Sequence, residues 1–73
     1  MADNRKLKMA ALSAATNIII KNCERSPERC VRNLLELGGK YIECKQAREI
    51  LFEICKTGNK EKLKQTFLSM IKI

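Results

Sequence analysis

The chain has 73 residues, of which 45% are hydrophobic and 32% charged, and its 15 basic against 8 acidic residues give a formal net charge of +7. This length holds one small domain, and the composition is that of a globular helical protein rather than a disordered one. No apolar run approaches the roughly 20 residues that cross a membrane, and the polar start of the chain does not resemble a signal peptide. We therefore expect a single cytoplasmic domain over residues 1–73, without a membrane span.

The first predicted helix runs from about Asn4 to Asn22, with Asp3 as its N-cap. Mostly apolar residues recur along it at spacings of three and four: Met9, Leu12, Thr16, Ile19 and Cys23. This spacing predicts one buried stripe on the helix. Four alanines between positions 10 and 15 widen the stripe and favour helix by their intrinsic propensity.

The second predicted helix begins at Pro27, because proline cannot continue a preceding helix but suits the first helical position. Ser26 is the expected N-cap, and Gly38 and Gly39 are the expected stop. The residues predicted to face inward are Cys30, Val31, Leu34, Leu35 and Leu37.

The third predicted helix runs from about Lys40 to Thr57, and the fourth runs from the N-cap Asn59 to the end of the chain. Their predicted inward faces contain Cys44, Ala47, Ile50, Leu51, Ile54 and Cys55, and Leu63, Phe67, Met70 and Ile71. Short connections make neighbouring helices fold back on each other. The sequence thus predicts an all-α protein, a compact bundle of about four helices joined by short turns.

Three consecutive isoleucines at positions 18 to 20 cover roughly 200° of the first helix, which is more than one packed face. Either the chain covers this helix from two sides, or part of the surplus is an exposed patch that joins another chain. Ile19 continues the buried stripe. We therefore predict Ile18 and Ile20 as the centre of an interface with a second copy or with another protein.

Four cysteines, Cys23, Cys30, Cys44 and Cys55, fall on the apolar faces of the predicted helices. No two of them form a short metal-binding pair, and the chain has no histidine, although four cysteines could still meet in space to hold zinc or an iron–sulfur cluster. A Cys23–Cys30 bridge fits around the Ser26 turn, but cytoplasmic cysteines are mostly reduced. We predict four reduced core cysteines, no metal and no cofactor.

Two groups of basic residues are candidate nucleic-acid contacts: Arg25, Arg29 and Arg32, and Lys56, Lys60, Lys62 and Lys64. A mixed aromatic and basic edge on the third helix, with Tyr41, Lys45, Arg48 and Phe52, could stack on bases or follow phosphates. The second and third predicted helices do not form a convincing helix-turn-helix, because three glutamates of the third helix would face the phosphates if it entered a groove.

A catalytic set is missing from the sequence. Without histidine the commonest general base is absent, and no glycine-rich loop has the spacing of a phosphate-binding motif. We expect no enzyme activity and no small-molecule substrate. The leading hypothesis is a helical protein–protein interaction module, acting as a homodimer or as a regulatory or accessory subunit. The alternative is a small basic nucleic-acid-binding protein.

Overall fold

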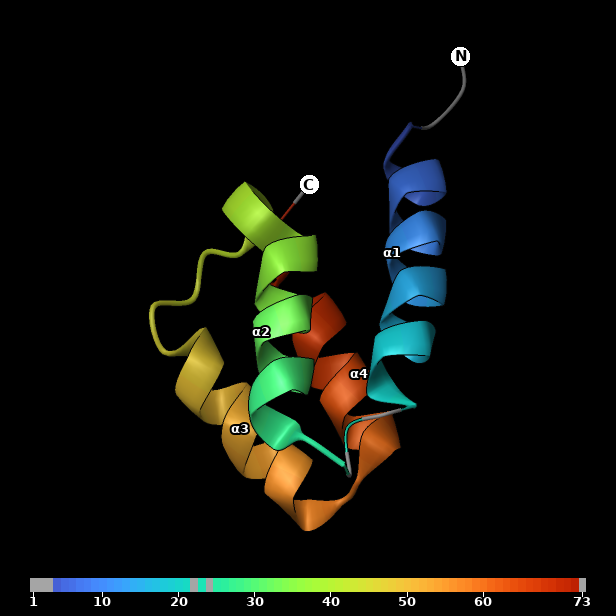
Figure 1. Cartoon of the computed structure of the whole chain (residues 1–73). Coiled ribbons are helices and arrows are strands. Elements are labelled where there is room, and N and C mark those ends of the chain that lie inside the picture. Colours follow the sequence, from blue (N-terminus) through green and yellow to red (C-terminus); the bar gives the residue numbers. More distant parts are fainter. Residues whose placement is uncertain (1–3, 22, 24, 73) are drawn as a thin grey trace.

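A computed structural model of the chain describes residues 4–21, 23 and 25–72, and the predicted cap at Asp3 and helix end at Asn22 lie outside these residues. The described chain forms four α-helices and one short 3₁₀ turn (Figure 1): α1 Asn4–Ile20, α2 Pro27–Gly38, η1 Gly39–Tyr41, α3 Ala47–Thr57 and α4 Lys60–Met70. The predicted all-α bundle is confirmed. None of these helices is long and apolar enough to cross a membrane.

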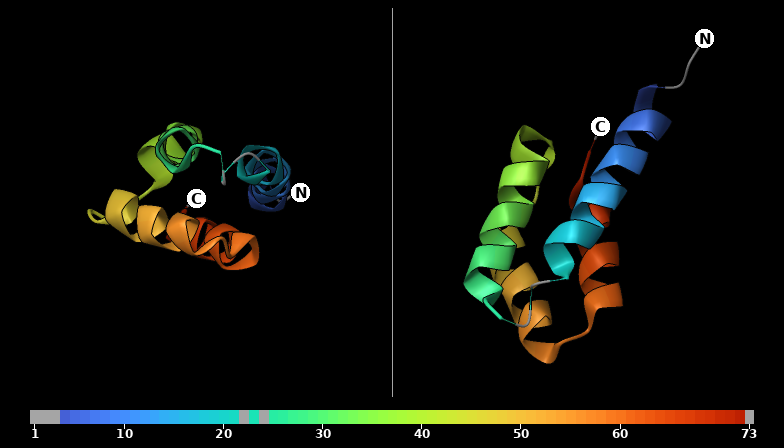
Figure 2. Two further views of the ribbon diagram at one scale, coloured as in Figure 1. Left: turned by 60° about the horizontal axis from the view of Figure 1, so that its bottom comes forward. Right: turned by 45° about the vertical axis from the view of Figure 1, so that its right-hand side comes forward.

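The helices pack in two layers, with α1 and α2 over α3 and α4 (Figure 2). Helix α1 packs on α2 and α4, and α3 packs on α2 and α4. Successive helices run in opposite directions, so the end of α1, the start of α2 and the turn 57–60 lie at the same end of the bundle, the lower end in Figure 1. We call this the turn end.

The core is drawn from all four helices and matches most of the predicted inward faces. Leu34, Leu51, Leu63 and Phe67 are fully buried. Thr16 is buried as well, and its hydroxyl donates a hydrogen bond of 2.6 Å to the carbonyl oxygen of Leu12. This bond removes the cost of burying the hydroxyl. The exception among the predicted core residues of α3 is Ile50, which is 36% exposed.

The prediction that the third helix begins near Lys40 is wrong, because α3 begins only at Ala47. Ile42 is extended instead, and it pairs with Ile71 in an isolated antiparallel bridge. The Ile42 side chain lies directly on Gly38, where a β-carbon would collide with it. A contact with the far end of the chain thus overrides the local helical pattern of residues 40–46.

The same contact ends the last helix early. The prediction that the fourth helix reaches the end of the chain is wrong, because α4 stops at Met70 and Ile71 is extended. The backbone N–H of Lys72 donates to the carbonyl oxygen of Tyr41 at 2.8 Å. Met70 and Ile71 are buried as predicted, so the extended end still completes the core.

The N-terminal caps of α2 and α4 differ. Ser26 is the N-cap of α2 as predicted, but its side chain makes no capping hydrogen bond. Asn59 caps α4, and its Oδ1 accepts a hydrogen bond of 3.0 Å from the backbone N–H of Lys62. Only the second cap therefore satisfies one of the unpaired N–H groups at a helix start.

We expect Asn59→Ala to lower the free energy of unfolding by about 1 kcal/mol, because the N–H of Lys62 loses its acceptor. Urea unfolding followed by circular dichroism measures the change. Ser26→Ala is the matched control, since this substitution removes no capping hydrogen bond. Equal effects of the two substitutions would contradict the prediction.

Candidate functional site

Helix α1 is apolar on two opposite faces. Its inner face, with Thr16 and Ile20, is buried against α2 and α4. Its outer face carries Leu7 and Ile18, each 65% exposed and among the few large hydrophobic side chains on the described surface. Ala11 and Ala14 lie between them and are exposed too. We call the residues Leu7, Ala11, Ala14 and Ile18 the outer α1 stripe.

The structure separates the two predicted interface residues. Ile18 belongs to the outer α1 stripe, whereas Ile20 is 5% exposed and forms part of the core. Two residues correspond to about 200° of helix rotation, so the two side chains point to opposite sides of α1. Ile20 is therefore a core residue and not an interface residue, and Ile19 is half-buried between the two faces.

Leu7 is the exposed residue that sequence reasoning missed. It lies eleven residues, or three helical turns, before Ile18. With Ala11 and Ala14 it follows the alternating spacing of four and three residues that marks a helix–helix contact in coiled coils. This spacing was visible in the sequence, but the buried stripe on the other side of the helix concealed it.

The outer α1 stripe is surrounded by positive charge. Lys6 and Lys8 flank Leu7, Lys21 follows Ile18 by one turn, and all three are exposed. The helix itself contains no acidic residue between Asn4 and Ile20. The apolar stripe therefore lies in a positive field that favours acidic partners.

The predicted arginine contacts lie at the start of α2, all of them exposed. Arg25 and Arg29 line one cavity of about 420 Å³ beside Ile18. Arg32 lies one helical turn from Glu28 and one from Glu36, and the three line a second cavity together. Carboxylates on both sides of Arg32 weaken the positive potential that phosphates would require.

The predicted lysine contacts are mixed with carboxylates as well. Lys56 Nζ lies 3.4 Å from Glu53 Oε1 and 4.9 Å from the centre of the Phe52 ring. Lys62 lines a shallow cavity with Glu53 and another glutamate of α3. Lys60 is exposed and Lys64 is half-buried on α4.

The predicted aromatic and basic edge is not assembled. Tyr41 lies in η1, with the Nζ atoms of Lys8 and Lys40 at 5.9 and 5.6 Å from its ring centre. Lys45 precedes α3, and Phe52 lies on α3 under a different lysine. The edge depended on a third helix that began at Lys40, and the extended segment around Ile42 breaks it.

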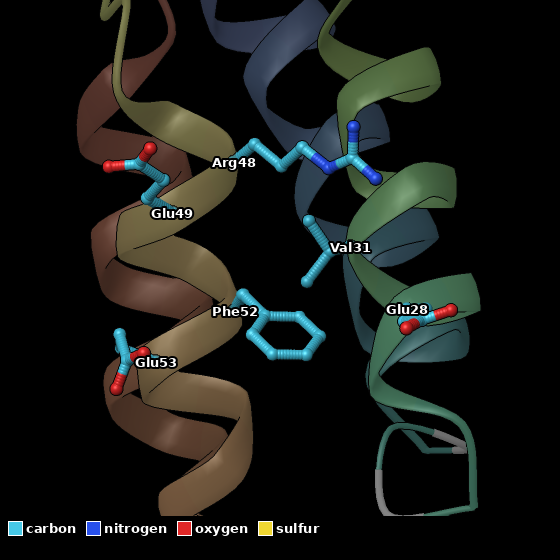
Figure 3. A pocket seen from close by; sticks show the side chains of 6 residues that line it. All are labelled: Glu28, Val31, Arg48, Glu49, Phe52 and Glu53. Carbon is cyan, nitrogen blue, oxygen red and sulfur yellow. The ribbon is translucent and has the colours of Figure 1, made fainter.

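A shallow surface groove of about 580 Å³ runs between α2 and α3 (Figure 3). Val31 and Phe52 point toward one another across it, and the Arg48 side chain reaches over from α3. Glu49 and Glu53 also border the groove but point away from the Phe52 ring. Its described lining has no cysteine, serine or threonine, so the groove holds no side-chain nucleophile of these types.

Three of the four cysteines meet at the turn end of the bundle. Cys23 and Cys55 form a disulfide, and the sulfurs of Cys23, Cys30 and Cys55 all lie within 4.8 Å of one another. All three are buried, as predicted, but the prediction that all four cysteines are reduced is wrong. The observed bridge is also not the Cys23–Cys30 bridge that the short Ser26 turn would allow. We call these three residues the cysteine cluster.

The free thiols differ in their surroundings. Cys30 is buried and its Sγ lies 3.9 Å from the carbonyl oxygen of Ile19. Burial raises the pKa of the Cys30 thiol, because the desolvated thiolate is disfavoured. Cys44 is half-buried before the start of α3 and does not belong to the cysteine cluster.

Comparison with known protein families, curated proteins and solved structures finds no match for this chain. Two features stand out from the rest of the described chain, the outer α1 stripe and the cysteine cluster. The stripe offers an apolar contact for another helix, and the cluster offers three sulfur atoms in a buried site.

Proposed function

We propose that this protein is a small helical interaction module that binds a protein partner through the outer α1 stripe. The observation that carries the proposal is the exposure of Leu7 and Ile18, each 65%, on the face of α1 opposite the core. An apolar row of this kind on a small domain is typical of a contact surface. The protein acts in this proposal as a cytoplasmic binding subunit and not as an enzyme.

The charge around the stripe favours a partner other than a second copy. A second copy would bring its own Lys6, Lys8 and Lys21 to the same contact, in a parallel or an antiparallel dimer. Like charges at a helix–helix contact are destabilising. We therefore propose an accessory subunit that binds an amphipathic helix with acidic residues beside its apolar face.

We expect Ile18→Glu and Leu7→Glu to weaken partner binding by about 10-fold or more, because each places a charge in the apolar contact. The free energy of unfolding should change by less than about 0.5 kcal/mol, since both side chains are largely exposed. The partner is captured from a cell extract with the tagged protein, and binding is then measured with the purified partner.

Ile50→Glu is the matched control, because Ile50 is also an exposed large hydrophobic residue but lies on α3. The proposal requires that this control and the wild type bind the same partner with equal affinity. It also requires that the partner binds through an acidic amphipathic helix of its own. Equal binding by Ile18→Glu would contradict it. The homodimer would be favoured over the accessory subunit by one result in sedimentation. In that result the wild type is a dimer at low micromolar concentration and Ile18→Glu is a monomer.

Nucleic-acid binding is the second candidate, favoured by the formal charge of +7 and by the exposed arginines at positions 25 and 29. Glutamates lie among the other basic contacts, which weakens this candidate relative to the first. Titration with DNA and RNA at several salt concentrations separates the two. Submicromolar affinity that falls steeply with salt would favour the nucleic-acid function.

A further inference from the structure

The proposed interaction surface makes no use of the cysteine cluster. Its three members come from three elements: Cys23 follows α1, Cys30 lies in the second turn of α2, and Cys55 lies in the last turn of α3. Their sulfur atoms converge within 4.8 Å in the core. A single disulfide uses two of these sulfurs and leaves the third beside it.

We propose that the cysteine cluster, once the disulfide is reduced, binds one copper(I) ion through three thiolates. Metal–sulfur bonds of about 2.3 Å around a three-coordinate ion place the sulfurs about 4 Å apart. The three sulfurs of this chain already lie within 4.8 Å of one another. This proximity belongs to the disulfide-bonded chain, and it shows that the fold brings all three sulfurs to one place in the core. Retention of that fold after reduction lowers the entropy cost of binding.

The number and kind of ligands favour copper(I) over zinc. Structural zinc sites take four protein ligands, whereas this group has three. Cys44 lies outside the group, and the chain has no histidine to complete a tetrahedron. Thiolates select soft ions, and copper(I) is a soft ion that accepts three sulfur ligands in a site closed to water.

Positive side chains around the cysteine cluster suit the charge of such a complex. Three thiolates and one copper(I) ion carry a net charge of −2, which a buried site tolerates only beside cations. Arg25 and Arg29 line the cavity that Cys30 borders, and Lys60 lines a narrow crevice beside the other two cysteines. No acidic residue is among the described residues that line either space.

The disulfide and the metal exclude each other, because both use the sulfurs of Cys23 and Cys55. Reduction by a phosphine breaks the sulfur–sulfur bond, delivers two electrons and two protons to give two thiols, and converts the phosphine with water to its oxide. Binding of copper(I) then displaces one proton from each of the three thiols into solvent.

The test titrates the reduced full chain, freed of phosphine and kept without oxygen, with copper(I) against the chromophoric chelator bicinchoninate. We expect one ion per chain and three sulfur neighbours by X-ray absorption. Cys30→Ala should lower the affinity about 100-fold or more, since even groups outside the ligand set change metal affinity by roughly 10–100-fold. Cys44→Ala is the matched control and should bind as the wild type does.

Three results of the binding titrations would overturn the proposal. These are an affinity of Cys30→Ala within about threefold of the wild type, an equal loss in Cys44→Ala, or equal binding by the oxidised chain. The number of sulfur neighbours of the bound ion is measured on the wild type. It therefore tests the three-thiolate site even if Cys30→Ala unfolds. Two or four sulfur neighbours would also contradict a site of three thiolates.

Discussion

Breaking the Cys23–Cys55 disulfide is expected to lower the free energy of unfolding by about 3–4 kcal/mol. The two cysteines are 32 residues apart, so the bridge closes nearly half of the chain into a loop and restricts the unfolded state. A domain of 73 residues has a small core and little stability to spare. Reduction should therefore remove a large part of the free energy of unfolding.

Urea unfolding of the oxidised and the phosphine-reduced chain, followed by circular dichroism, measures this difference. The double variant Cys23→Ala, Cys55→Ala is the control, since phosphine should not change its stability. Equal stability before and after reduction would show that the bridge contributes nothing. Four free thiols in the denatured, unreduced protein would show that the bridge does not form.

Phe67→Ala and Leu51→Ala are each expected to lower the free energy of unfolding by about 2–4 kcal/mol. Both side chains are fully buried, Phe67 on α4 and Leu51 on α3, and these two helices pack on each other. Truncation removes apolar contacts from the centre of the core and leaves a cavity that rigid helices fill only in part.

The control for the core substitutions is Ile50→Ala, one position from Leu51 on the same helix. Ile50 is 36% exposed, so its truncation should cost clearly less than that of Leu51. Urea unfolding under oxidising conditions compares the three variants with the wild type. Losses below about 0.5 kcal/mol for both Phe67→Ala and Leu51→Ala would mean that the core is not where the structure places it.

Local signals in the sequence were enough to predict four helices and most of their ends. Pro27 begins α2, Gly58 ends α3 with a positive φ of 75°, and Asn59 caps α4. These signals act within a few residues, because proline, glycine and capping side chains constrain only the neighbouring backbone. They do not depend on how the helices pack.

The surplus of apolar surface on the first helix was also visible in the sequence, but the side that faces outward was not. When a helix has apolar residues on two faces, the sequence pattern does not say which face packs on the core. Packing against α2 and α4 buries Ile20 and leaves Ile18 and Leu7 outside. The outer α1 stripe therefore became clear only from the fold.

The cysteine cluster could be predicted from the sequence only in part. Antiparallel helices with short turns bring the end of α1, the start of α2 and the end of α3 to one end of the bundle. This arrangement already places Cys44 apart from the other three cysteines. The spacing along the chain favoured Cys23 with Cys30, its neighbour across one turn. The bridge instead joins Cys23 to Cys55, because spatial proximity and not sequence distance decides which sulfurs meet.

The sequence by itself thus determined the helical class, the helix starts at Pro27 and Lys60 and most of the buried positions, since periodicity and caps are local properties. Tertiary structure decided the extended segment around Ile42, which exchanges a predicted helical turn for a bridge to Ile71. It also decided the disulfide and the outward face of α1. In each of these cases the deciding contact joins residues far apart in the chain, and no local pattern carries information about such a contact.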